Sequence, residues 1–242
     1  MALHFERNEY ASRMERLQEA MRERKLDAVL LFSQESMYWL TGYDTFGFCF
    51  FQSLVVKADG SMVLLTRSAD LRQARHTSII ENIVVWTDRA DANPAFDLRN
   101  LLSDLGLLGM KIGVEYQTHG LTAANGKRLD EQLNTFAALS DFSGIIDTLR
   151  AVKSSAEIEK VRRAAELGDA ALERAVPLIK AGADEGDILA AMHAAIFEGG
   201  GDYPANEFII GSGPDALLCR YKAGRRKLDP QFLILDSARD VQ

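Results

Sequence analysis

The sequence predicts an α/β protein of two units, and three observations support this prediction. Short apolar runs alternate with amphipathic segments over residues 1–147, which is the pattern of a layered α/β domain. Within this region, an Ala58-Asp-Gly-Ser61 turn separates two apolar runs, so we expect a hairpin and a sheet of mixed direction. The alternation stops near residue 150, and two consecutive helices followed by strands form a second unit at 148–242.

The elements of the first unit follow from local patterns. Apolar side chains recur at helical spacing over 7–25, at Tyr10, Met14, Leu17 and Met21. Runs too short for buried helices predict strands at 27–33, 48–56, 62–66, 83–86 and 111–115. Further helices are expected at 68–77, 94–105 and 122–133. Cys49 lies inside the second apolar run, where we expect a small, inert hydrophobic side chain.

A long helix opens the second unit. Ser154, with Glu157 three residues later, forms the reciprocal capping pattern of a helix N-terminus, and apolar residues then recur as far as Ile179. We expect this helix to end at Gly182, with Pro177 bending it or ending its regular part, because proline removes a backbone donor. A second helix is expected at 184–198, followed by short strands at 208–210 and 232–236.

Composition limits the classes of function. The 242 residues carry a formal net charge of −7, which speaks against general binding to nucleic acid or anionic membranes. No uninterrupted apolar stretch reaches the roughly 18 residues of a membrane helix. The charged N-terminus lacks the apolar core of a signal peptide. Only two cysteines occur, Cys49 and Cys219, so we expect no disulfide framework and a cytoplasmic location.

Few residues belong to a recognisable chemical motif. Gly211-Ser-Gly213 is interpreted as a tight turn, and His193, which has no acidic or histidine partner at ligand spacing, as a structural residue. Five cations between Arg220 and Lys227 indicate either a solvated loop or an anion-attracting wall. Asp236 follows an apolar run, and carboxylates at strand ends suit hard divalent metals. With Asp240 it would supply half a metal site at best, and a surface role is the alternative.

Two stretches in this order resemble landmarks of a known family. They are Tyr38-Trp-Leu-Thr-Gly-Tyr43 and the segment with Arg150, Lys153 and Glu157-Ile158. Both are similar to segments of the metallopeptidase family that contains aminopeptidase P, prolidase and creatinase, and the resemblance covers nearly the whole chain. It implies a creatinase-like N-terminal domain with a mixed sheet and flanking helices. The first helices and strands of a pita-bread α+β domain would follow.

The resemblance also implies a chemistry. Relatives bind two divalent metal ions through two Asp, one His and two Glu, and the ions generate a hydroxide and polarise the scissile carbonyl. Asp236 matches the first Asp, whereas the other ligands would lie beyond Gln242. We therefore expect a truncated or partial homologue of metal-dependent C–N hydrolases of the Xaa-Pro peptidase, creatinase and ectoine hydrolase type. It would hold no cofactor of its own and be inactive alone.

One position departs from the peptidase pattern. Arg220 stands where peptidase relatives carry a histidine, and a guanidinium stays charged and suits anion recognition. The resemblance thus makes Arg220 and Tyr221 the candidate substrate-binding residues, with Arg220 as a carboxylate clamp. It favours the branch with ectoine hydrolase and the metal-dependent dimethylsulfoniopropionate lyase, whose substrates are small and amino-acid-like, whereas other relatives act on peptides.

Two alternatives to a hydrolase fragment stay open. An incomplete second domain would expose apolar surface, so we expect a homodimer, and the chain could serve as a non-catalytic binding or dimerisation module. An unrelated α/β protein that binds a small molecule is the third possibility. A nucleotide that raises the melting temperature would favour that third class.

Overall fold

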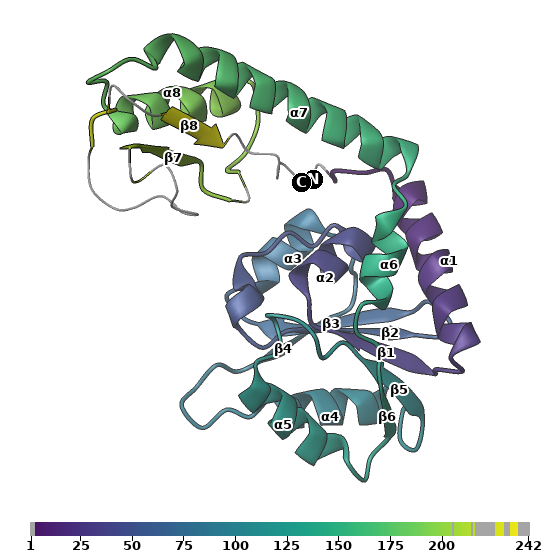
Figure 1. Cartoon of the computed structure of the whole chain (residues 1–242). Helices are drawn as coiled ribbons and strands as arrows, with labels where there is room; N and C mark the ends of the chain where they lie inside the picture. Colours follow the sequence, from purple (N-terminus) through teal and green to yellow (C-terminus); the bar gives the residue numbers. More distant parts are fainter. Residues whose placement is uncertain (1–2, 205, 214, 216–225, 230–232, 237–242) are drawn as a thin grey trace. The chain divides into compact units, whose positions relative to one another are not determined.

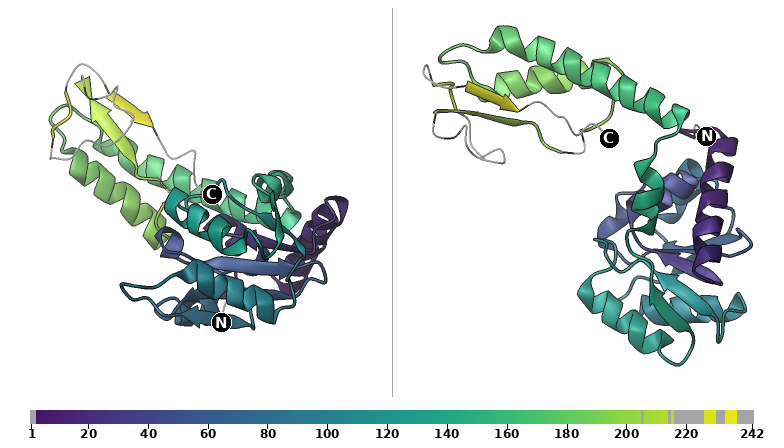
Figure 2. Two further views of the ribbon diagram at one scale, coloured as in Figure 1. Left: turned by 90° about the horizontal axis from the view of Figure 1, so that it is seen from below. Right: turned by 45° about the vertical axis from the view of Figure 1, so that its right-hand side comes forward.

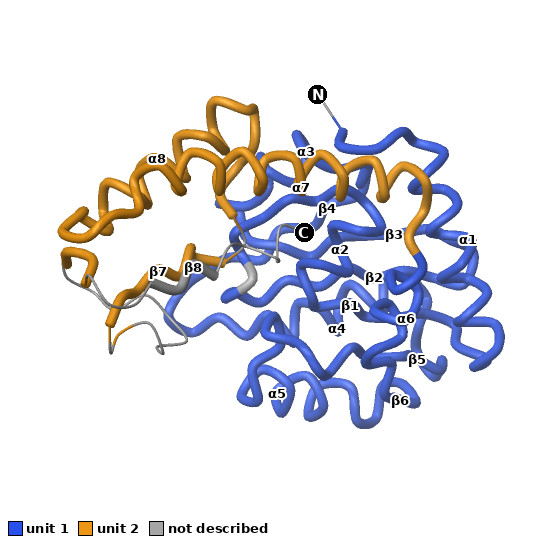
Figure 3. The backbone as a smooth tube through the Cα atoms, turned by 45° about the horizontal axis from the view of Figure 1, so that its top comes forward, with its two compact units in different colours: residues 1–152 blue, residues 153–242 orange. Residues whose placement is uncertain are grey.

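The computed structural model describes residues 3–204, 206–213, 215, 226–229 and 233–236, the last four by their backbone (Figure 1). The chain forms two compact units, unit 1 at residues 1–152 and unit 2 at residues 153–242 (Figure 3). Within the described part of the chain, every helix is too short or too polar to cross a bilayer.

Unit 1 is built on a six-stranded mixed sheet with the strand order β4-β3-β2-β1-β5-β6. The strands are β1 (Ala28–Leu31), β2 (Ser53–Lys57), β3 (Met62–Arg67), β4 (Ile83–Trp86), β5 (Lys111–Val114) and β6 (Ala138–Asp141). The helices are α1 (Arg7–Glu23), α2 (Gln34–Thr41), α3 (Leu71–Thr77), α4 (Pro94–Asp104), α5 (Ala123–Leu133) and α6 (Ile145–Ala151). Strand β2 pairs antiparallel with β1 and β3, and the other pairs are parallel, so the predicted mixed sheet is confirmed.

Helices cover both faces of this sheet (Figures 1 and 2). Because side chains alternate along a strand, Ala28 and Leu30 of β1 pack into a core with α4 and α5. Val29 and Leu31 pack on the opposite face, in a core with α1, α2 and α6. Each β1 side chain is fully buried, so the buried strand predicted from the continuous apolar run is confirmed.

Helix α2 contains most of the Tyr38–Tyr43 landmark, and the sequence did not predict it. It ends at Gly42, which adopts φ +78° and donates its N–H to the Tyr38 carbonyl at 2.7 Å. The Thr41 hydroxyl donates to the Met37 carbonyl at 2.6 Å and accepts from the Tyr43 N–H at 3.1 Å. The Thr-Gly pair of the landmark therefore serves to stop a helix.

The strand expected at 48–56 begins only at Ser53. A 3₁₀ turn, η1 (Gly47–Cys49), occupies its first part and leaves Cys49 exposed, so the expectation that Cys49 lies inside an apolar strand was wrong. The buried Gln52 side chain explains the turn, because its amide donates to the Gly47 carbonyl at 2.8 Å while its oxygen accepts from the Tyr43 hydroxyl at 2.6 Å. These bonds draw the loop back over the sheet.

Unit 2 contains α7 (Ser155–Ala175), η2 (Val176–Leu178), α8 (Glu185–Glu198), β7 (Ile209–Ser212) and β8 (Leu233–Asp236). The predicted capping box is confirmed, since the Ser154 hydroxyl accepts from the Glu157 N–H at 3.1 Å and the Glu157 carboxylate accepts from the Ser154 N–H at 2.9 Å. Helix α7 ends at Ala175, before the expected Gly182, because Pro177 falls in η2 and ends the regular helix.

Helices α7 and α8 lie side by side, and β7 and β8 form an antiparallel pair next to them (Figures 1 and 2). Their shared core includes Leu167 and Ala171 of α7, Ile188 and Met192 of α8, and Ile210 of β7. Gly211 and Ser212 belong to β7, so the expectation of a tight turn at these two residues was wrong.

Candidate functional site

The structure describes the backbone of one predicted site residue and leaves the other two outside its described residues. Asp236 is the last residue of β8, where its Cα is paired with that of Ile209 in β7, and the description there is confined to the backbone. Arg220 and Tyr221 lie outside the described residues. The roles assigned to these three residues from sequence therefore stay predictions.

Residues 226–229, which precede β8 in the chain, form backbone hydrogen bonds with the residues just before α8. The Gly182 N–H donates to the Leu228 carbonyl at 2.9 Å, and the Leu228 N–H donates to the Ala183 carbonyl at 2.8 Å. The Asp229 N–H donates to the Ser212 hydroxyl at the end of β7 at 2.8 Å. These bonds hold residues 228 and 229 to the segment that leads into α8 and to the end of β7.

A buried ion pair reinforces the same anchor. Glu185, the first residue of α8, is 1% exposed, and its Oε2 lies 3.2 Å from Nε of Arg226. Arg226 also contacts Asp215, with 2.5 Å between Nη1 and Oδ2. Burial raises the pKa of the Glu185 carboxyl, the Arg226 charge opposes this, and Asp215 and Asp184 raise it further.

Arg226 belongs to the cation cluster that the sequence assigned to a solvated loop or an anion-attracting wall. Its guanidinium is instead only 20% exposed and lies between two carboxylates of its own unit. The only signal in the sequence was an acidic residue, Glu185, at the start of an apolar helix. The sequence does not identify Arg226 as the partner of Glu185, because the two residues lie far apart in the chain.

Replacing Arg226 by methionine is expected to lower the stability of unit 2 by about 3 kcal/mol at neutral pH, because the Glu185 carboxylate loses a cation inside the protein. Hydrogen exchange of the α8 amides measures this loss. The raised pKa of Glu185 means that its protonated form suits the fold, so the loss should shrink as the pH falls into the acid range.

An Arg174→Met variant is the matched control for Arg226→Met. Arg174 pairs with Glu198 at 2.5 Å on the surface, where both side chains are about half exposed, so its loss should be close to neutral. Adding Glu185→Gln to Arg226→Met should restore protection of α8. No restoration would contradict the buried ion pair as the anchor.

A metal centre of the implied kind needs several ligands at one place. Among the described residues, no three His, Cys, Asp or Glu side chains gather closely enough to hold a metal ion. The described side chains therefore do not form the two-metal cage of the family that the sequence resembles.

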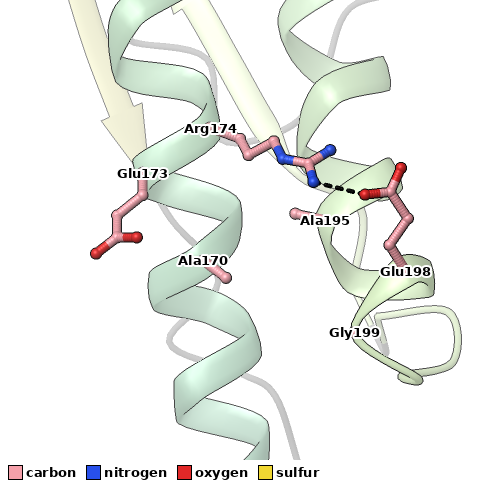
Figure 4. A pocket seen from close by; sticks show the side chains of 6 residues that line it. All are labelled: Ala170, Glu173, Arg174, Ala195, Glu198 and Gly199. Atoms are coloured by element: carbon pink, nitrogen blue, oxygen red, sulfur yellow. Dashed lines mark hydrogen bonds and ion pairs between the residues drawn. The ribbon is translucent and has the colours of Figure 1, made fainter.

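Two surface pockets are lined by residues of unit 2 that the structure describes. One of about 490 Å³ lies between α7 and α8, lined by Ala170, Glu173, Arg174, Ala195, Glu198 and Gly199 (Figure 4). The Arg174 guanidinium and the Glu198 carboxylate pair across it, so its two opposite charges already satisfy each other. The other pocket, of about 330 Å³, lies between α8 and the segment that leads into β7.

Comparisons with known proteins support the family resemblance. Residues 13–152 match the creatinase/prolidase N-terminal domain, and residues 159–241 match metallopeptidase family M24. The chain is 27% identical to ectoine hydrolase of Halomonas elongata over 232 residues, which cover 89% of this chain and 58% of the relative. An uncharacterised hydrolase/peptidase of Sinorhizobium fredii is 27% identical over 208 residues, or 83% of this chain and 53% of the relative.

Solved structures share the fold. An X-Pro aminopeptidase from Thermotoga maritima superimposes with a TM-score of 0.73 at 21% identity, covering 89% of this chain and 57% of the other. A prolidase from Thermococcus sibiricus gives a TM-score of 0.75 at 19% identity, with 90% and 58% covered. The predicted fold class is confirmed. The chain spans little more than half the length of these relatives.

Proposed function

This chain belongs to the creatinase/prolidase family, whose N-terminal domain matches residues 13–152, and from this premise we propose that it is a partial homologue of metal-dependent C–N hydrolases. The match of residues 159–241 to family M24 supports this proposal. In it, the described residues supply the scaffold of a hydrolase and not its metal cage, so the 242-residue chain is inactive alone.

The observation that carries the proposal is the pairing of β8 with β7. Asp236 ends this strand within the M24-matched segment, and the strand is preceded by the buried Glu185–Arg226 pair. A position at the end of a paired strand suits a metal-binding carboxylate, because the strand pairing fixes its backbone. The proposal assigns Asp236 as a metal ligand. It assigns Arg220 and Tyr221 as substrate contacts, with Arg220 binding a carboxylate.

The names of the relatives suggest the class of substrate. One relative is an ectoine hydrolase and structural neighbours are an X-Pro aminopeptidase and a prolidase, so the proposed substrates are small amino-acid-like molecules or peptides. Relatives of this family are expected to use two divalent metal ions. A homodimer in the cytoplasm completes the proposal.

Metal analysis together with an activity assay tests this proposal. The purified chain is dialysed against Mn²⁺ or Co²⁺, its bound metal is counted, and hydrolysis of a Gly-Pro dipeptide and of ectoine is followed. We expect less than one bound ion per chain and no cation-dependent turnover, because the described side chains form no cage. Stoichiometric binding of two ions with turnover would overturn the proposed inactivity and leave the family assignment intact.

A binding or dimerisation module is the second candidate, and exposed apolar residues favour it. Ile158 and Val161 of α7 are 38% and 45% exposed. Apolar side chains grouped along one helix are typical of an association surface. Sedimentation velocity over a range of concentrations tests this candidate, and a chain that stays monomeric throughout would exclude a dimerisation module.

A further inference from the structure

The pocket between α8 and the segment before β7 has an apolar wall and a polar rim. Leu189, His193 and Phe208 are its buried or half-buried lining, and Phe208 is only 4% exposed. Tyr203, Asn206 and Glu207 line it as exposed residues. With a volume of about 330 Å³, it has room for a small organic molecule.

The imidazole of His193 in this apolar wall costs folding free energy. Its ring lies 4.9 Å from that of Phe208 and stacks against Phe197 with an interplanar angle of 17°. Among the described residues, its Nδ1 is buried and has no hydrogen-bond partner. A buried polar atom without a partner costs folding free energy, whereas a phenylalanine would fill the same space without that cost. The sequence-based interpretation of His193 as a structural residue leaves this cost unexplained.

The rim determines which charge the pocket attracts. Glu207 provides a carboxylate, Asn206 provides an amide oxygen, and the described lining contains no lysine or arginine. The Tyr203 ring is 82% exposed and packs edge-on against Phe197 at 4.9 Å. A carboxylate beside an accessible aromatic ring favours a cation, because charge attraction and the cation–π interaction act on the same group.

We propose that this pocket binds a small organic cation, an ammonium group on a short apolar chain. The ammonium lies between the Glu207 carboxylate and the Tyr203 ring, and the apolar chain lies against Leu189 and Phe208. After a small rotation of its ring, His193 gains from the ligand N–H the hydrogen-bond donor that it lacks in the free protein. The binding uses residues of unit 2 alone and does not depend on hydrolase activity.

Butylammonium is a suitable probe, with 1-butanol and butyrate as its neutral and anionic counterparts. The 242-residue chain is prepared with ¹³C-labelled histidine rings, and the signal that disappears in a His193→Phe variant assigns His193 among the four histidines. We expect butylammonium to shift this signal saturably, and the other two probes to bind about tenfold more weakly or worse. Equal binding of butylammonium and butanol would overturn the cation site.

Variants separate recognition from packing. Glu207→Gln should weaken butylammonium binding about tenfold, while Glu173→Gln, which removes an exposed carboxylate of α7 outside this pocket, should leave it unchanged. His193→Phe should raise the melting temperature by about 2–4 °C and weaken binding, because it removes the unpaired nitrogen and the ligand contact together. A lowered melting temperature with unchanged binding would show that His193 only packs.

Discussion

Replacing Gly42 by alanine is expected to lower the free energy of unfolding of unit 1 by about 3–4 kcal/mol. Gly42 follows α2 with φ +78°, a conformation that strains any residue with a Cβ. A Cβ built there would lie 2.7 Å from the Tyr10 hydroxyl oxygen and 3.0 Å from the Thr77 carbonyl oxygen. Neither group yields easily, since Tyr10 is 1% exposed and the Thr77 atom is backbone.

Urea unfolding followed by tryptophan fluorescence measures this effect, because both tryptophans, Trp39 and Trp86, are buried in unit 1. Gly106→Ala is the matched control. Gly106 has φ +74° and no atom within 4 Å of a built Cβ, so it carries the backbone strain of about 1 kcal/mol without the collision.

Tyr10 should account for part of the Gly42→Ala cost. Introducing Gly42→Ala into a Tyr10→Phe background removes the hydroxyl that the new Cβ would meet, so the cost of the alanine should fall. If Gly42→Ala costs no more than Gly106→Ala, then α2 does not end against Tyr10 as closely as the structure describes.

Elements with purely local signals were predicted well. Strand β4 has the predicted bounds, and α8 and the Ser154–Glu157 cap lie where periodicity and capping placed them, because those signals lie within a few residues of the element. Helix α2 was missed for the opposite reason. Its N-terminus is held by the Glu115 carboxylate, about 80 residues further along the chain. A pattern of neighbouring residues cannot predict a contact over that distance.

The candidate site shows the same division. A strand ending at Asp236 follows from a short apolar run, and β8 ends there. The Glu185–Arg226 pair and the unpaired nitrogen of His193 depend on chain segments that meet only after folding. Sequence patterns identify which residues are charged, but burial and pairing decide whether a charge anchors a strand, attracts a ligand or faces water.

Replacing Glu115 by alanine is expected to destabilise unit 1 by about 3 kcal/mol. Glu115 follows β5 and is 6% exposed. Its Oε2 accepts from the N–H groups of Phe32 and Ser33 at 2.9 and 2.7 Å, and its Oε1 accepts from the Ser36 hydroxyl at 2.6 Å. Alanine would leave these donors at the start of α2 without their acceptor. Tryptophan fluorescence during urea unfolding measures the loss.

Glutamine at position 115 should behave differently from alanine. Its carbonyl oxygen can accept from the two backbone N–H groups while its amide donates to the Ser36 hydroxyl, as a protonated glutamate would. Burial raises the pKa of Glu115, against the hydrogen bonds from Ser36, Ser33 and Phe32. Glu115→Gln is therefore expected to be at least as stable as the native chain at neutral pH.

The stability of Glu115→Gln relative to the native chain should depend on pH in a defined direction. Because the folded-state pKa of Glu115 is raised, its favourable contribution is fully present below the unfolded pKa and is lost as the pH rises through the folded pKa. The advantage of Glu115→Gln over the native chain should thus disappear between about pH 7 and about pH 4. Glu35→Gln is the control, and its stability relative to the native chain should change with pH in the opposite direction. Although burial acts to raise the pKa of Glu35, the hydrogen bonds from Ser33 and from its own backbone lower it. If the stability of Glu115→Gln relative to the native chain instead grows on acidification, then the fold stabilises the charged form of Glu115, and its folded-state pKa is lowered and not raised.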